Sequence, residues 1–324
     1  MPSAIRITEV GGPDVMKLES VNVGDPGPNE VRVRQSAVGL NYIDTYHRSG
    51  LYKIPLPSGI GSEAAGVLEA VGAGVTEFKA GDRVAYSGGP LGAYADARVM
   101  PVDRLVKIPD GVTDRSAATL MLKGLTVQYL LRQTYRVKAG EMILLHAAAG
   151  GIGLIACQWA RALGVTVIGT VGSDEKAALA KANGCTHTIV YTRENFVERV
   201  KEITGGKGVP VVYDAIGKDT FPASLDCLSP RGLWVSFGNA SGAIPPFDIL
   251  QLSVKGSLYA TRPNLFTHTA KRADLLAMAA EMFELVRAGK LVNDARQTYA
   301  LADAAKAHRD LESRKTTGST VLLP

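Results

Sequence analysis

The stretch Glu141–Gly153 constrains the fold more than any other part of the sequence. The apolar run Met142–Leu145 passes through small residues into glycines, and an amphipathic segment then continues to Gly164. This pattern predicts a strand, a tight turn and a helix, with Gly164 as the residue that stops the helix. Such a unit is the first β-turn-α element of a nucleotide-binding sheet.

The turn itself carries Gly150, Gly151 and Ile152. Glycines let a diphosphate approach the backbone, and the helix that follows directs free N–H groups and the positive end of its dipole toward an anion. The loop departs from the G-x-G-x-x-G pattern because Ala148 stands at the first glycine position. Taken alone, the loop therefore indicates a dinucleotide site and a plain tight turn about equally.

Length and composition favour a soluble protein of two domains that binds a small molecule. The chain has 324 residues and a net charge of +5, with its lysines and arginines scattered rather than gathered in a basic run. A mild positive field suits a small anionic ligand, and nucleic acid is not expected as the main partner. No apolar run reaches the ~20 residues that span a bilayer, and no signal peptide is expected. Three cysteines without metal-type spacing favour a reducing cytoplasm.

The first 110 or so residues are predicted to form a barrel-like unit of short strands separated by Gly- and Pro-rich turns. The predicted strands are Ala4–Val10, Met16–Val23, Glu30–Val38, Ala64–Val71, Arg83–Tyr86 and Gly92–Met100. Between them, residues 41–61 are expected to form a polar, aromatic loop, which is functional or mobile when it lies inside a compact domain.

After Pro109 the pattern changes to helices, and from Glu141 strands and helices alternate, which predicts a doubly wound parallel sheet. The predicted strands are Met142–His146, Val165–Thr170, His187–Val190, Val211–Asp214, Leu233–Phe237 and Lys255–Tyr259. The predicted helices are Asp114–Met121, Thr126–Thr134, Ile152–Leu163, Asp174–Asn183, Glu194–Ile203, Thr220–Cys227 and one near Ile249. A long helix over Leu265–Ala288, strands near 291–299 and 318–323 and a helix over 302–313 are expected to return to the first domain.

The end of the second strand of this sheet indicates which nicotinamide nucleotide binds. An NAD enzyme has a carboxylate there for the ribose 2′-hydroxyl. In this chain the strand tip carries Gly172 and Ser173, and Lys176 follows one turn into the helix. A hydroxyl and a cation suit a 2′-phosphate, which predicts NADPH. The alternative is that Ser173 only caps the helix and Lys176 is solvated. The neighbouring Asp174 and Glu175 argue against a phosphate at this place, because they are negatively charged.

Ordered motifs along the whole chain carry a resemblance to a known family. They are residues 39–44 (Gly-Leu-Asn-Tyr-Ile-Asp), 48–52, 61–66, 123–126, 146–153, 212–214, 236–239, 259–263 and 311–314. On these residues the chain resembles the zinc-free, zeta-crystallin-like quinone oxidoreductases of the medium-chain dehydrogenase/reductase superfamily. The resemblance implies an α/β fold in which a GroES-like catalytic domain (1–124 plus 263–324) holds an inserted NADP-binding Rossmann domain (125–262). It also implies NADPH-dependent reduction of a small quinone, with semiquinone as the product, and a homodimer.

Zinc enzymes of the superfamily carry a cysteine in the segment that corresponds to residues 39–44 and a histidine before a glutamate. Here Asn41 and Ser62 stand at those positions, with Ser62 before Glu63. Because a catalytic zinc needs about three protein ligands, we expect no metal.

The residues expected to bind the cofactor lie in both predicted domains. Some follow from the Rossmann pattern, and Lys176, Ser173, Tyr191 and Arg314 match the adenosine-phosphate contacts of the family. The full set is Asn41, Thr126, Tyr129, Gly150, Gly151, Ile152, Gly172, Ser173, Lys176, Tyr191, Phe237, Gly238, Arg262 and Arg314. Alternatively, Tyr191 covers the sheet, Phe237 belongs to the core and Arg314 is a solvated helix-end charge.

Around the nicotinamide and the quinone we expect Asn41, Asp44, Tyr46, Tyr52 and Arg262. Asn41 could donate to a quinone oxygen, and the tyrosines could stack on an aromatic acceptor or simply pack. No catalytic residue is assigned. His146 is expected to be a buried, hydrogen-bonded structural histidine.

Two other functions remain open on the same scaffold. One is an NADPH-dependent enone or alkenal double-bond reductase, which needs a proton donor such as Tyr46 or Tyr52. The other, from a different class, is a nucleotide-gated RNA-binding or structural protein, which a steep salt dependence of RNA affinity would support.

Overall fold

The computed structural model describes residues 1–324, which form two compact units. The first, here called the β-rich unit, comprises Met1–Leu125, Thr269–Ala288 and Val292–Pro324. The second, here called the Rossmann unit, comprises Thr126–His268 and Gly289–Leu291. The domain limits expected from the sequence, at 124/125 and 262/263, stay a prediction. Residues 263–268, which were assigned to the catalytic domain, lie in the compact Rossmann unit.

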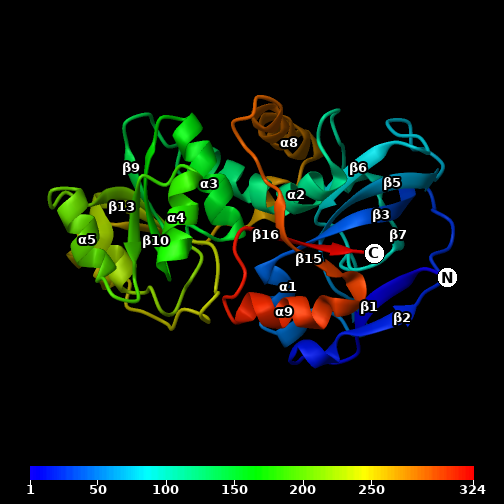
Figure 1. The fold of residues 1–324 in the computed structure, drawn as a ribbon, viewed down its shortest axis with the longest axis horizontal. Coiled ribbons are helices and arrows are strands. Elements are labelled where there is room, and N and C mark those ends of the chain that lie inside the picture. Colours follow the sequence, from blue (N-terminus) through cyan, green and yellow to red (C-terminus); the bar gives the residue numbers. More distant parts are fainter. The chain divides into compact units, whose positions relative to one another are not determined.

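The Rossmann unit is built on a six-stranded sheet in which every neighbouring pair is parallel (Figure 1). Its strands, in spatial order, are β11 (His187–Val190), β10 (Thr166–Val171), β9 (Met142–Leu145), β12 (Val209–Asp214), β13 (Leu228–Ser236) and β14 (Tyr259–Thr261). Numbered from β9, this is the 3-2-1-4-5-6 order of doubly wound dinucleotide folds. The predicted parallel sheet is confirmed.

Short helices alternate with these strands along the chain. They are α3 (Gly151–Ala162), α4 (Asp174–Ala182), α5 (Phe196–Ile203), α6 (Leu250–Val254) and α7 (Leu265–His268), with a 3₁₀ helix at Ala223–Cys227. The core between sheet and helices includes Leu144, Ile168, Val212 and Trp234. In place of the helix predicted at 220–227, the structure has a 3₁₀ helix at Ala223–Cys227.

The β-rich unit contains a seven-stranded and a three-stranded sheet. The strands are β1 (Ser3–Ile7), β2 (Lys17–Ser20), β3 (Glu30–Leu40), β4 (Ser58–Gly59), β5 (Glu63–Val71), β6 (Arg83–Ser87), β7 (Ala97–Pro101), β8 (Leu105–Lys107), β15 (Ala295–Ala300) and β16 (Ser319–Leu323). The larger sheet has the order β15-β16-β3-β5-β6-β8, with β7 also paired to β3. Because β16 pairs antiparallel with β3, the carboxyl-terminal elements return to the first unit, as expected.

The stretch 41–61, expected as a loop, contains the helix α1 (Tyr42–Ser49). The helix begins in a capping box: the Asn41 N–H donates to Asp44 Oδ2 at 2.9 Å. It ends at Gly50, which has φ of 81° and so adopts the left-handed conformation of a helix C-cap. The prediction of a loop was wrong for residues 42–49, because the polar residues that cap this helix are also common in loops.

Two further helix predictions were wrong in their limits. The segments predicted at 114–121 and 126–134 form one helix, α2 (Asp114–Tyr129), which continues as a π-helical segment over Leu130–Thr134. Gly124 does not break α2: a Cβ there would lie 2.3 Å from Met282 Sδ, so the glycine permits close packing on α8 (Arg272–Arg287). The predicted helix 265–288 is split into α7 and α8, with Lys271 in extended conformation before α8.

The last helix of the β-rich unit is α9 (Ala304–Glu312), which packs on the core through Ala304, Ala307 and the fully buried His308. None of the helices combines the length and the apolar character that crossing a bilayer requires.

Candidate functional site

The glycine loop has the tight geometry that a dinucleotide turn requires. Ala147 adopts a left-handed φ of 57°, and Gly150 is the extended N-cap of α3. A Cβ on Gly153 would lie 2.3 Å from the Ala147 carbonyl oxygen, so only glycine fits there. The first turn of α3 contains Gly151 and Ile152 and no acidic residue, which leaves its N–H groups and the positive end of the helix dipole for an anion.

The end of β10 gathers four of the predicted cofactor residues within the Rossmann unit. Ser173 is the N-cap of α4, and its Oγ accepts the Lys176 N–H at 3.3 Å. The Tyr191 hydroxyl lies against Gly172, where a Cβ would be 3.0 Å from it. Ser173 thus caps the helix, and it does so beside a half-buried lysine and a tyrosine hydroxyl.

The negative charge of Asp174 argues against a phosphate site at this place. In the structure, Asp174 forms an ion pair with Arg193, a residue that the sequence analysis did not identify. The Arg193 guanidinium donates to Asp174 Oδ2 at 2.7 Å and to Oδ1 at 2.5 Å. This exposed pair holds the pKa of Asp174 below its usual value. The local signal that could have found Arg193 is weak, since it follows β11 while Asp174 follows β10.

The far half of the sheet fixes Arg262. Its Nη1 donates to Ser236 Oγ and to the Gly238 carbonyl oxygen, each at 2.9 Å. Phe237 is half-buried beside them, and Gly238 is buried with no room for a Cβ. Arg262 and Gly238 therefore meet at the carboxyl end of β13, the edge of the sheet where ligands of such folds bind.

Thr126 and Tyr129 are buried in the Rossmann unit. The Tyr129 ring stacks on His268, with ring centroids 4.5 Å apart and an interplanar angle of 5°. One face of this tyrosine is therefore covered by an imidazole of the same unit.

The two tyrosines predicted to contact the acceptor, Tyr46 and Tyr52, form a row with Tyr42 in the β-rich unit. The ring centroids of Tyr42 and Tyr46 are 5.6 Å apart, and those of Tyr46 and Tyr52 are 5.2 Å apart. Tyr46 is buried, whereas Tyr52 and Tyr42 are half-buried. The row is thus partly packed and partly accessible.

Asn41 is buried and its amide is used inside the protein. Its Nδ2 donates to Glu63 Oε2 at 2.7 Å and more weakly to the Gly39 carbonyl oxygen at 3.4 Å. Glu63 also accepts the Leu122 N–H at 2.6 Å, and Lys123 Nζ lies 3.4 Å from its Oε2. The amide donors of Asn41 are therefore committed to Glu63 rather than directed at a ligand.

These residues do not fit a zinc ion. The Lys123 ammonium, which also donates to the Leu40 carbonyl oxygen at 3.1 Å, provides a fixed positive charge beside Glu63. Nowhere in the chain do three or more His, Cys, Asp or Glu side chains gather as they would around a metal. Neither an ammonium nor an amide belongs to the Cys, His and carboxylate groups that ligate zinc, so the groups around Glu63 do not form a zinc site.

Asp44 is fully buried and belongs to a chain of hydrogen bonds that the sequence did not reveal. Its Oδ2 accepts from the Asn41 N–H and from the Tyr94 hydroxyl, both at 2.9 Å, while its Oδ1 has no protein partner. Burial raises the pKa of the Asp44 carboxyl to about 7. Asp44 therefore anchors the first turn of α1, and its role toward a ligand stays a prediction.

His146 has a structural role in the Rossmann unit. Its Nδ1 and Nε2 lie 2.9 Å from Thr170 Oγ1 and 3.0 Å from Ser224 Oγ, and burial lowers its pKa. Asp214 accepts from Ser224 Oγ at 3.0 Å and from the Ile216 and Gly217 N–H groups. The imidazole is thereby held neutral within a satisfied network.

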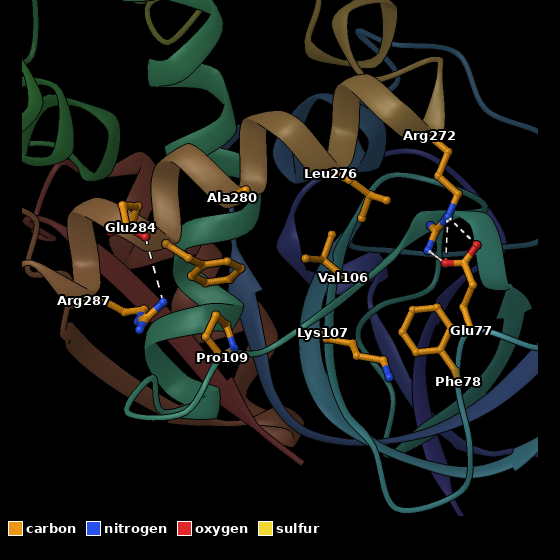
Figure 2. A pocket seen from close by; sticks show the side chains of 11 residues that line it. Glu77, Phe78, Val106, Lys107, Pro109, Arg272, Leu276, Ala280, Glu284 and Arg287 are labelled. Atoms are coloured by element: carbon orange, nitrogen blue, oxygen red, sulfur yellow. Dashed lines mark hydrogen bonds and ion pairs between the residues drawn. The ribbon is translucent and has the colours of Figure 1, made fainter.

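A hollow of about 410 Å³ lies in the β-rich unit beside α8 (Figure 2). It is lined by Glu77, Phe78, Val106, Lys107, Pro109, Arg272, Leu276, Ala280, Phe283, Glu284 and Arg287. Its cations already have carboxylate partners, such as Glu77 for Arg272 and Asp82 for Lys107 at 3.1 Å. None of the residues predicted for the functional site lines it.

Comparison with known proteins places this geometry in a family. Residues 27–110 match the alcohol dehydrogenase GroES-like domain, and residues 151–275 match the zinc-binding dehydrogenase domain. A quinone oxidoreductase of Pseudomonas aeruginosa is 57% identical over 100% of both chains. A 2-haloacrylate reductase of a Burkholderia species is 49% identical over 100% of this chain and 99% of its own. The crystal structure of the Escherichia coli quinone oxidoreductase complexed with NADPH is 50% identical, covers 99% of this chain and 100% of its own, and has a TM-score of 0.98.

A two-unit fold with a GroES-like part and a Rossmann sheet defines a medium-chain dehydrogenase/reductase. Within that superfamily, the chain belongs to the quinone oxidoreductases. The fold class and the resemblance predicted from the sequence are both confirmed.

The raised pKa of Asp44 predicts how stability depends on pH. The folded protein holds this proton more tightly than the unfolded chain, so the associated stability is present at about pH 4 and is lost as the pH rises through about 7. Replacing Asp44 by Asn should therefore reduce the loss of melting temperature between pH 5 and pH 8, as measured by thermal unfolding at both values. Equal losses in the variant and the parent protein would show that Asp44 is ionised at both pH values.

Proposed function

We propose that this protein catalyses the NADPH-dependent reduction of quinones without a metal ion, with one-electron transfer to the semiquinone. The observation that carries the proposal is the end of β10, where Ser173, Lys176 and Tyr191 gather and where Asp174, one of the two carboxylates after the N-cap, is paired with Arg193. A dianionic 2′-phosphate needs donors and cations at the place where an NAD site has an acceptor. Relatives along the full chain include quinone oxidoreductases, one of them solved with NADPH.

The cofactor-binding residues fall into two groups. Gly150, Gly151 and Ile152 hold the diphosphate at the N-terminus of α3. Gly172, Ser173, Lys176, Tyr191 and Arg314 bind the adenosine phosphate. Phe237, Gly238, Thr126, Tyr129 and Arg262 shape the nicotinamide end, with Asn41 beside it. The bound NADPH supplies the reducing electrons.

On the acceptor side, Tyr46, Tyr52 and Arg262 are the groups that contact the quinone, and Asn41 and Asp44 hold α1 in place. A quinone accepts electrons without a Lewis acid, so close stacking and a donor for the developing oxyanion are sufficient. The aromatic row offers a stacking surface, and the guanidinium of Arg262 offers positive charge.

The proposal is tested by following NADPH oxidation under anaerobic conditions with a simple para-quinone and, separately, with a conjugated enone. We expect rapid turnover with the quinone, accompanied by a semiquinone signal in electron paramagnetic resonance. Fast quinone turnover without that signal would leave quinone reduction standing and replace the one-electron step with a two-electron one.

The second candidate function is reduction of an activated carbon–carbon double bond. It is favoured by one observation, the 49% identity to a 2-haloacrylate reductase, because an acrylate carries such a bond. This chemistry needs a proton donor near the α-carbon, and Tyr52 is the half-buried candidate. Turnover of the enone alone, lost in Tyr52→Phe, would establish this function in place of the first.

Cofactor choice gives a sharper prediction. Lys176→Ala should raise KM for NADPH about tenfold and leave KM for NADH nearly unchanged, since a charge-assisted contact to phosphate is worth ~1.5 kcal/mol or more. Initial rates with both nucleotides measure the split. Lys181→Ala, a change near the other end of the same helix, is the matched control. Equal losses for both nucleotides would remove Lys176 from the phosphate site.

We further propose that the protein is a cytoplasmic homodimer formed through the edge of the Rossmann sheet. β14 ends the sheet, and Tyr259 on it is 61% exposed. Close by in sequence, α6 and the residue before it expose Ile249, Leu250 and Val254, the last by 77%. An open strand edge and an adjacent apolar helix are features that a second copy covers. The cytoplasmic location is supported by three buried cysteines that form no disulfide.

The dimer is tested with Val254→Asp, which places a charge in the apolar patch. We expect light scattering to report a dimer for the parent protein and a monomer, or a dimer dissociating at much higher concentration, for the variant. Leu18→Asp, at another exposed apolar position on β2, should stay dimeric. A monomeric parent protein would contradict the proposal outright.

A further inference from the structure

The turn that follows β11 contacts the end of β10 through consecutive residues. The Tyr191 hydroxyl lies against Gly172, where a Cβ would be 3.0 Å from it. Thr192 Oγ1 donates weakly to the Gly172 carbonyl oxygen at 3.4 Å. Arg193 then reaches Asp174, the first residue of α4. This turn therefore forms one side of the place at which the proposed function locates the adenosine phosphate.

Hydrogen bonds around Val190 close this turn. The Arg193 and Glu194 N–H groups both donate to the Val190 carbonyl oxygen at 3.0 Å. In return, Glu194 Oε1 accepts the Val190 N–H at 2.8 Å. The backbone of Arg193 is thus held at the end of β11, and its side chain extends from there to α4.

Arg193 and Asp174 form a forked ion pair. Arg193 Nη1 donates to Asp174 Oδ2 at 2.7 Å, and Nη2 donates to Oδ1 at 2.5 Å. Both oxygens of the carboxylate are therefore occupied at once, which a single lysine contact does not achieve. The two side chains are 57% and 69% exposed, and such a pair adds little to stability. Variants at either position are therefore expected to fold.

The place of Asp174 in the chain gives its charge a meaning for nucleotide choice. Asp174 directly follows Ser173, the N-cap of α4, and a carboxylate there suits the helix dipole whichever nucleotide binds. An unpaired carboxylate repels a dianionic 2′-phosphate and can accept a hydrogen bond from a 2′-hydroxyl. When a guanidinium occupies both oxygens, its charge offsets the repulsion and the acceptors are already used.

We propose that Arg193 is a positioning residue for cofactor selection: by holding both oxygens of Asp174, it keeps that carboxylate from repelling a 2′-phosphate and from accepting a 2′-hydroxyl. This rests on the proposed function, in which Ser173 and Lys176 bind the adenosine phosphate. Arg193 acts through Asp174 and does not itself contact the phosphate. The preference for a 2′-phosphorylated nucleotide over its unphosphorylated counterpart therefore depends on this ion pair.

Two other roles of Arg193 predict different outcomes. If the guanidinium binds the phosphate directly, then removing the charge of Asp174 cannot replace it. If the pair only joins the two turns, then its loss affects both nucleotides alike. If Arg193 offsets the charge of Asp174, then removing both charges should return the site close to its original preference. A double variant therefore separates the three explanations.

The test measures binding rather than turnover. Calorimetry gives the Kd values of adenosine 2′,5′-bisphosphate and of 5′-AMP, whose ratio isolates the 2′-phosphate. In Arg193→Gln we expect this preference to fall about fivefold, which is the effect of one exposed charge. In Arg193→Gln/Asp174→Asn most of the preference should return, and Asp174→Asn alone should keep it. In about 1 M NaCl, where charges are screened beyond ~3 Å, the loss in Arg193→Gln should shrink.

The outcomes that contradict the two proposals are different. A parent protein that binds both nucleotides equally would show that the phosphate site of the proposed function is wrong. If the parent protein prefers the bisphosphate and Arg193→Gln prefers it as strongly, the role of Arg193 is wrong. That role is equally wrong if the double variant is no better than Arg193→Gln, or if high salt leaves the loss unchanged.

Two matched variants control for charge alone. Arg193→Gln/Glu175→Gln removes a carboxylate of the same turn that does not pair with Arg193, and it should restore less of the preference. Equal restoration would show that the loss of any negative charge in this turn is enough. Arg287→Gln removes an exposed arginine of the β-rich unit, which lies 3.9 Å from Glu284, and should leave the preference unchanged. A loss there would show that net charge, rather than the ion pair, sets the preference.

Discussion

The carboxylate of Glu63 is the group on which the β-rich half of the site depends. It is fully buried and holds together three elements: the Leu122 N–H and Lys123 ammonium of α2, the Asn41 amide before α1, and its own strand β5. Burial raises its pKa, while Lys123 and the hydrogen bonds lower it. A buried carboxylate persists only when it is paired and hydrogen-bonded in this way. Its position thereby fixes where α1, with its row of tyrosines, begins.

The residues around Glu63 also differ from the ligands of a zinc site. In place of a metal ion and its ligands, the chain has an internal cation, Lys123, and an amide that links Glu63 to the cap of α1. Positive charge is retained near the buried carboxylate, but no open coordination position exists for a substrate oxygen. This charge distribution suits the proposed reduction of quinones, because a quinone accepts electrons without a Lewis acid.

The Rossmann unit could be predicted from local sequence patterns, whereas contacts between distant segments could not. Glycines, small residues and the alternation of apolar runs are signals within a few residues, and they placed β9, α3 and β10 within about two residues. The helix α1 was missed because its caps, Asn41 and Asp44, are residues typical of loops. The neutralisation of Asp174 by Arg193 and the link from Asp44 through Tyr94 to His308 join distant segments. A single sequence carries no sign of such pairs.

The distribution of buried polar groups has a physical meaning of its own. The Arg48–Glu312 pair joins a buried guanidinium to a carboxylate that is 35% exposed. Ion pairs often add little net stability, so stability alone does not account for this one. The hydrogen bonds of Glu63 with Asn41 and Leu122 fix the first turn of α1. The two hydrogen bonds from the Arg48 guanidinium to the Glu312 carboxylate fix its last turn. Apolar packing alone would tolerate small shifts of the helix, but directional hydrogen bonds at both ends do not. The helix α1, whose Tyr42 and Tyr46 pack in a row with Tyr52, is therefore held in a fixed orientation by polar anchors that a merely stable fold would not need.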